Sequence, residues 1–169
     1  MQTITKSDFE AAFQADPRAF RGRWSYMGPV CQRLAKLPDG PALELGPYTM
    51  PMVPGCDTMD RRDYGGVKPM FLHDATQTPW PIEDDSYDVF VALQVLEHLG
   101  DSQTEVWREV CRVARRAIIS IPWHWTKGQA DHIGIDRERV STWTLGMESV
   151  WTMVVPGIQD RRIYEFDLR

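Results

Sequence analysis

The chain has 169 residues, of which 43% are hydrophobic and 25% are charged, and its formal net charge is −5. This is the composition of a globular protein, and the length suffices for one α/β domain but not for a second one of ordinary size. The acidic balance argues against a nucleic-acid partner, which would require clustered Lys and Arg.

The cysteines and the apolar runs indicate the compartment. Cys31, Cys56 and Cys111 are odd in number and lack Cys-x-x-Cys spacing, so the sequence predicts neither a disulfide framework nor a zinc site. The first ten residues contain no apolar block of the secretory kind. The longest apolar run, residues 89–96, is far shorter than the roughly 20 residues that span a bilayer. We therefore expect a cytoplasmic protein without membrane insertion.

Residues 1–40 predict a helical segment that packs against the rest of a single domain. Apolar spacing favours short helices at 9–20 and 30–37, and Pro38-Asp39-Gly40 ends the second one. Between them, Arg23 and Trp24 precede the first strand of the core, where they form part of a lid over the sheet edge or simply pack as helix residues. Residues 41–169 form the expected α/β core.

The core opens with a strand whose usual partner helix is missing. Residues 42–45 form a short apolar strand that ends in the turn-forming pair Gly46-Pro47. The two prolines within residues 49–54 leave the helix that normally follows this strand short or absent. The next predicted strands are 56–60, 67–72, 87–93 and 117–121, and the last two have the uninterrupted apolar character of buried parallel strands.

A helix and a hairpin complete the predicted core. A helix is expected over 101–115, capped by Asp101 or Ser102, and a shorter one over 137–143. Strands at 149–155 and 161–168 flank Pro156-Gly157, which is a hairpin signal. The predicted fold class is therefore α/β and Rossmann-like, with a seven-stranded, mostly parallel sheet, one antiparallel strand and helices on both faces.

Four stretches, in this order, resemble the cofactor-binding signature of class I S-adenosylmethionine-dependent methyltransferases: A-L-E-L-G-P-Y, M-D-R-R-D-Y, F-L-H-D-A-T and Y-D-V-F-V-A-L-Q-V-L-E-H-L. The resemblance covers residues 41–169 and implies a small, single-domain methyltransferase that uses S-adenosyl-L-methionine. In this chain the family's glycine-rich loop is reduced to G-P-Y-T-M-P. That departure argues against a nicotinamide cofactor, because the pyrophosphate of such a cofactor needs a glycine-rich loop at a helix N-terminus.

The chemistry of the cofactor gives two acidic residues a role under this resemblance. A carboxylate at the end of a strand can accept hydrogen bonds from both ribose hydroxyls, and Asp60 occupies that place. Asp74 matches the acceptor for the adenine amine, with the backbone of Ala75 against the ring. A charged surface turn is the competing interpretation for both acids.

The methionine half of the cofactor is expected near the first and fourth strands. Gly46 lets the backbone approach the ligand because a side chain there would occupy its space. Glu44 orders this loop or reaches the ammonium group through water, since an unpaired carboxylate in a buried strand is costly. Gln94 lies where the family contacts the methionine moiety.

The loop after the fifth predicted strand provides the candidate acceptor site. His124 and His132 are predicted catalytic residues, because a histidine near an acceptor hydroxyl can serve as a general base. Trp123 and Trp125 could shape a pocket for an apolar or sugar-like acceptor, with Asp136 in the same loop. Packing and loop hydrogen bonds are the alternative role for these histidines.

No metal site is predicted. A cluster of His124, His132 and Asp131 or Asp136 is conceivable, but its spacing matches no strong ligand motif. The pair Glu97-His98 within L-E-H-L occurs with many chemistries in the family, which implies mainly a structural role.

These features predict transfer of a methyl group from S-adenosyl-L-methionine to a small-molecule or glycan-type acceptor, with an oxygen nucleophile favoured over nitrogen. The alternative is a non-catalytic methyltransferase-like module that serves as a partner or regulatory subunit. Exposed-looking Trp80 and Trp151 leave room for a homodimer, although core packing explains them as well.

Overall fold

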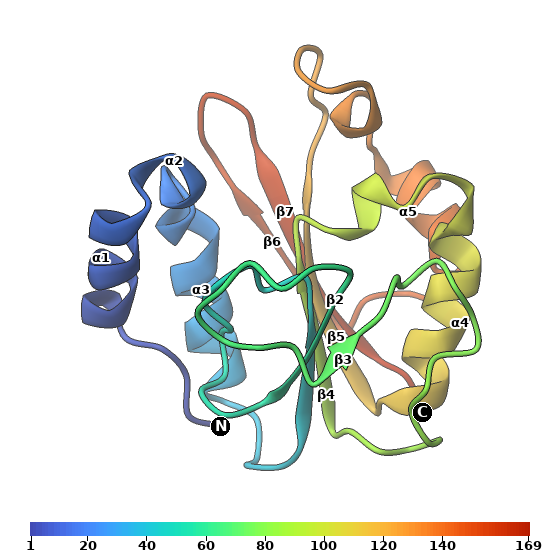
Figure 1. Cartoon of the computed structure of the whole chain (residues 1–169). Helices are drawn as coiled ribbons and strands as arrows, with labels where there is room; N and C mark the ends of the chain where they lie inside the picture. The colour runs from blue at the N-terminus through green and yellow to red at the C-terminus, as the bar shows by residue number, and fades with distance from the viewer.

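A seven-stranded sheet separates two layers of helices in the computed structural model, which describes residues 1–169 (Figure 1). The strand order is β3-β2-β1-β4-β5-β7-β6, and β7 is the one strand antiparallel to its neighbours. The predicted fold class is confirmed. The elements are α1 (Lys6–Ala15), α2 (Pro17–Phe20), α3 (Trp24–Leu34), β1 (Ala42–Leu45), β2 (Asp57–Asp60), β3 (Phe71–Leu72), β4 (Val89–Leu93), α4 (Gln103–Val113), β5 (Arg116–Pro122), α5 (Arg137–Trp143), β6 (Trp151–Val155) and β7 (Arg161–Asp167).

Both faces of the central strands are covered, which explains their continuous apolar sequence. Side chains alternate across a strand, so in β4 Phe90 and Ala92 belong to the core that includes α4 and α5. Val89 and Val91 belong to the second core, which includes α1, α2 and α3. Figure 1 shows these two helical layers on opposite sides of the sheet. A strand covered on both faces has no polar side to present, as expected for parallel sheets.

The helix boundaries depart from prediction where capping and proline decide them. The helix expected over 9–20 breaks at Asp16, whose side chain accepts the Ala19 N–H and caps α2, with Pro17 in the first position of that helix. The expected caps of α4 are wrong. Ser102 precedes this helix without any side-chain capping bond, because a 3-10 turn at Gly100–Ser102 leads directly into it.

The connection from β1 to β2 contains no helix, as the two prolines predict. The edge strand β3 pairs over only two residues and is shorter than expected. None of the helices has the length and apolar character that crossing a membrane requires.

Trp80 does not offer a surface for self-association. It is only 3% exposed, and its indole N–H donates to the carbonyl of Ala75 at 2.9 Å. Trp151 is half-buried and lies under the guanidinium of Arg33.

A buried ion triad ties the N-terminal helical layer to strands β5 and β7. Glu165 in β7 is fully buried and pairs with Arg33 of α3 and with Arg116 of β5, the latter at 3.0 Å. Each arginine retains some exposure, whereas the carboxylate has none. Loss of both arginines would therefore leave Glu165 as an unpaired buried charge, which is strongly destabilising.

We expect the double substitution Arg33→Met and Arg116→Met to lower the free energy of unfolding by about 3–5 kcal/mol, because it leaves Glu165 buried without a cation. Urea denaturation measures this loss. The matched control is Arg108→Met, which removes an exposed pair with Glu105 and should cost less than about 1 kcal/mol. Equal stability of the double variant and the control would contradict the structural role of the triad.

Candidate cofactor-binding site

A cavity of about 650 Å³ opens at the carboxyl ends of β1, β2 and β4. Ligands of open α/β sheets bind at this edge, and the volume falls within the roughly 300–1,000 Å³ of small-molecule sites. Five of the six residues predicted to contact the cofactor line the cavity: Gly46, Asp60, Asp74, Ala75 and Gln94.

The two predicted acids occupy different surroundings within this cavity. Asp60 ends β2 and is 8% exposed, and burial raises the pKa of its carboxyl. Its Oδ1 accepts the N–H of Arg62 at 3.3 Å, which leaves acceptor capacity for a ligand. Asp74 lies in the loop after β3, and its Oδ1 accepts bonds from the N–H and hydroxyl of Thr76. These bonds lower the pKa of Asp74 and keep it ionised.

Two residues at strand ends adopt left-handed backbone conformations around the cavity. Gly46 has φ of 66°, and a Cβ there would come within 2.7 Å of the Val95 side chain. Gln94, directly after β4, has φ of 58°, which is uncommon for a residue other than glycine. Its side-chain amide donates to Ser120 and accepts from Arg161, both at 3.2 Å. The side chain of Gln94 is thus committed to neighbours, and backbone strain of this kind concentrates at functional sites.

Glu44 lies beneath the cavity and does not line it. The carboxyl is 3% exposed and accepts the N–H of Met52 at 2.6 Å, with a further bond from the backbone of Val53. It thereby fastens the loop that replaces the missing helix to β1. Burial raises the pKa of Glu44 to about 8.

The N-terminal layer and the loop after β2 also contribute to the cavity wall. Arg23, which immediately precedes α3, lines the cavity, and its guanidinium lies over the ring of Tyr48. Tyr48 in turn packs against Tyr64 with ring centroids 4.9 Å apart. The sequence analysis named Arg23 for its place before the first strand. Tyr48 and Tyr64 end two of the stretches that resemble the cofactor-binding signature, but neither was assigned a role.

The candidate acceptor-site residues in the loop after β5 lie in different surroundings. Trp123 is buried, and Asp136 caps α5 by accepting the Arg139 N–H at 2.9 Å. His124 is exposed and does not line the cavity. Trp125 packs edge-on against His132. Neither predicted catalytic histidine lines the cavity, but His132 lies beside His98, which does.

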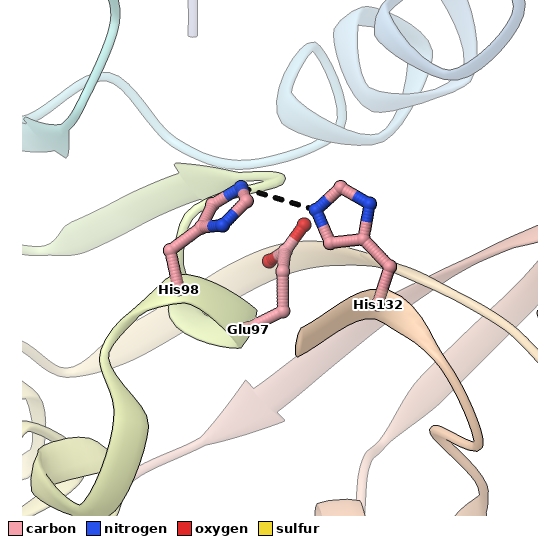
Figure 2. Close-up of side chains that lie close together, drawn as sticks. All are labelled: Glu97, His98 and His132. Atoms are coloured by element: carbon pink, nitrogen blue, oxygen red, sulfur yellow. Dashed lines mark hydrogen bonds between the residues drawn. The ribbon is translucent and has the colours of Figure 1, made fainter. Parts of the chain in front are cut away.

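Four ionisable side chains, which we call the rim cluster, gather at the edge of the cavity: Glu97, His98, Asp131 and His132. His98 and Asp131 line the cavity and are joined by a hydrogen bond to Nδ1 of His98. Nε2 of His132 lies 3.2 Å from Nε2 of His98. Figure 2 shows the Glu97 carboxylate directed between the two imidazoles.

Burial sets the protonation of the rim cluster. It raises the pKa of Glu97 to about 8 and, together with the charge of His98, lowers the pKa of His132. The resemblance implied a mainly structural role for Glu97 and His98. Nothing in L-E-H-L indicates that a second histidine from a distant loop faces them.

We expect Glu44→Gln to remove a specific pH dependence of stability. Folded Glu44 holds its proton up to a pKa of about 8, whereas the unfolded side chain loses it near pH 4.5. The contribution of this group is therefore fully present below about pH 4.5 and is lost as the pH rises to about 8. Relative to the parent, the variant should gain free energy of unfolding between pH 5 and 8, by an amount on the order of a few kcal/mol. Chemical denaturation across this range measures the difference, and a pH-independent difference would contradict the assignment.

Residues 52–117 match a family model described as a methyltransferase domain. The matched stretch begins after β1 and contains Asp60, Asp74 and the L-E-H-L segment. A comparison with curated proteins gave no significant sequence match.

Solved structures share the fold across almost the whole chain. A SAM-dependent methyltransferase from Aquifex aeolicus superposes with a TM-score of 0.66 at 15% identity, covering 97% of this chain and 99% of its own. The N-methyltransferase NodS from Bradyrhizobium japonicum, solved with S-adenosyl-l-homocysteine, gives a TM-score of 0.67 at 13% identity, covering 95% and 96%.

The identities are low, so these structures establish the fold alone. The chain therefore has the fold of solved S-adenosylmethionine-dependent methyltransferases, and its residues 52–117 match the model of a methyltransferase domain.

Proposed function

We propose that this methyltransferase transfers its methyl group to an oxygen nucleophile on a small-molecule or glycan-type acceptor. One observation carries the proposal: the lining of one cavity includes Asp60 and Asp74, which follow β2 and β3 on one side of β1, and His98 and Asp131, which follow β4 and β5 on the other side. A cofactor laid between them would direct its sulfonium toward His98 and Asp131.

The cofactor assignments follow from the hydrogen-bonding capacity of the lining residues. Asp60 accepts the ribose hydroxyls, since the backbone N–H groups of Arg61 and Arg62 leave acceptor capacity on its two oxygens. Asp74 offers its second oxygen to the adenine amine while the first stays with Thr76. The methionine tail lies along Gly46, where the absent side chain leaves room for it.

The chemical step is an in-line displacement. A lone pair of the acceptor oxygen forms the new O–CH₃ bond, the S–CH₃ bond breaks, and its electron pair returns to sulfur to leave S-adenosyl-L-homocysteine. The hydroxyl proton is lost to solvent at the part of the cavity where His98 and Asp131 lie. The protein aligns the reactants and excludes water, effects that supply up to about 7–11 kcal/mol in well-oriented systems.

The lining near the rim cluster supports a polar, hydroxylated acceptor. His98, Gln129 and Asp131 present donors and acceptors at this end, and the rings of Tyr48 and Tyr64 line the cavity as well. A nitrogen nucleophile is the second candidate, since NodS is described as an N-methyltransferase. At 13% identity that relative does not fix the nucleophile here.

Titration calorimetry with S-adenosyl-L-methionine and, separately, S-adenosyl-L-homocysteine tests the cofactor site. We expect micromolar binding of both, because the two ligands share every group that the assigned residues contact. Subsequent transfer of a labelled methyl group to hydroxylated and amine acceptors then distinguishes oxygen from nitrogen. Absence of binding by either ligand would refute the proposed site.

We expect Asp60→Ala to weaken S-adenosyl-L-homocysteine binding by roughly 10- to 100-fold, because hydrogen bonds to a charged group contribute about 1.5–3 kcal/mol. The same calorimetric titration measures the change. Asp101→Ala is the matched control, since this carboxylate is exposed and outside the cavity lining, and its affinity should equal that of the parent. Unchanged affinity in the Asp60 variant would remove the ribose assignment.

A further inference from the structure

Glu97 has a buried carboxylate whose two oxygens have no hydrogen-bond partner. The residue is 0% exposed, and neither Oε1 nor Oε2 is bonded to any protein group. A buried carboxylate without a partner is costly, and each such group in a native structure calls for an explanation. The missing partner has to lie where the carboxylate is directed, between His98 and His132 (Figure 2).

The two imidazoles have the spacing of ligands to one ion. Their Nε2 atoms are 3.2 Å apart. Two nitrogens at about 2.1 Å from a common ion lie about 3.0–3.4 Å apart at octahedral or tetrahedral angles. One ligand atom from each of Glu97, His98 and His132 lies within 4.8 Å of the others. Donors at about 2.1 Å from one ion can be at most about 4.2 Å apart, so the widest pair needs to close by no more than about 0.6 Å.

Asp131 fixes the orientation of one of these imidazoles. Its carboxylate accepts from Nδ1 of His98, which leaves the lone pair of neutral His98 on Nε2, facing His132. A carboxylate on the far nitrogen is the usual partner of a metal-binding histidine, because it selects the tautomer and holds the ring.

We propose that Glu97, His98 and His132 bind a divalent transition-metal ion at the rim of the cavity, with Asp131 orienting His98. Two imidazoles and one carboxylate suit ions such as Zn²⁺, Co²⁺ or Mn²⁺. Three protein ligands leave coordination positions open for an exogenous oxygen. His98 lines the cavity, so these positions lie next to the cofactor site.

The competing partner for Glu97 is Arg161. The guanidinium of Arg161 lies 5.2 Å from the ring centroids of both Tyr26 and Trp125, and its Nε donates to Gln94. No hydrogen bond joins it to Glu97. A water molecule between Arg161 and Glu97 would satisfy the carboxylate without a metal, and the experiment below separates the two arrangements.

The role of the ion rests on the proposed function, whereas its binding does not. A divalent cation that coordinates the acceptor hydroxyl lowers the pKa of that group and so favours loss of its proton to solvent. The resulting oxygen attacks the methyl group as described above, and sulfur receives the electron pair of the broken S–C bond. In this arrangement His98 and His132 act as ligands and not as proton acceptors.

Titration of chelator-treated protein with Co²⁺ tests the site, with the visible d–d absorption as the readout and Zn²⁺ as the competing ion. We expect saturable binding at one equivalent and displacement by Zn²⁺. Glu97→Gln and His132→Gln should each weaken Co²⁺ binding by more than about 10-fold, and Asp131→Asn by roughly 10- to 100-fold through the orientation of His98. His124→Gln is the matched control, because this histidine is exposed in the same loop and outside the rim cluster.

A d–d spectrum of the parent at millimolar Co²⁺ that equals the spectrum of Co²⁺ in buffer alone would overturn the proposal and favour the Arg161 arrangement. Equal Co²⁺ affinity in Glu97→Gln, His132→Gln and His124→Gln would also overturn it. S-adenosyl-L-homocysteine binding is measured on the same metal-free protein. Retained nucleoside binding without Co²⁺ binding would reject the metal site alone, whereas Co²⁺ binding without nucleoside binding would reject the cofactor site alone.

Discussion

Parallel pairing of β1 with β2 and β4 brings the carboxyl ends of these strands to one edge of the sheet. Three of the residues assigned to the cofactor depend directly on this constraint. Asp60 ends β2, Gly46 follows β1, and Gln94 follows β4. The residues are far apart in the sequence, but the strands run in the same direction, so their carboxyl ends bring these residues together at one edge of the sheet.

The loss of the helix after β1 changes how this edge is supported. A helix would rigidify the turn by its own backbone hydrogen bonds, and here a buried side chain does so instead. Glu44 binds the backbone at Met52 from within β1, so the loop is anchored to the sheet. This anchoring gives a carboxylate a role inside a strand that is otherwise apolar. Burial raises the pKa of Glu44, while the backbone hydrogen bonds partly offset that rise. The reduced glycine loop is therefore compatible with an ordered cavity.

Much of the fold followed from the sequence because its signals are local. The bounds of β1 and α5 are as predicted, since proline, glycine and apolar runs mark them directly. Trp80 looked exposed because its neighbours are polar and prolines flank it, yet tertiary packing buries it. The rim cluster could not be predicted for a related reason. His98 and His132 meet only because a 3-10 turn after β4 faces a second one after β5, and neither turn has a pattern that predicts this contact.

The central claim is that one cavity holds the nucleoside at Asp60 and Asp74 and directs the reacting sulfur toward the rim cluster. A crystal structure of the protein with S-adenosyl-L-homocysteine tests this most directly. The account predicts ribose hydroxyls against Asp60, the adenine amine at Asp74, and sulfur on the side of His98. A ligand bound elsewhere, or bound in this cavity with its sulfur directed away from His98, would contradict it.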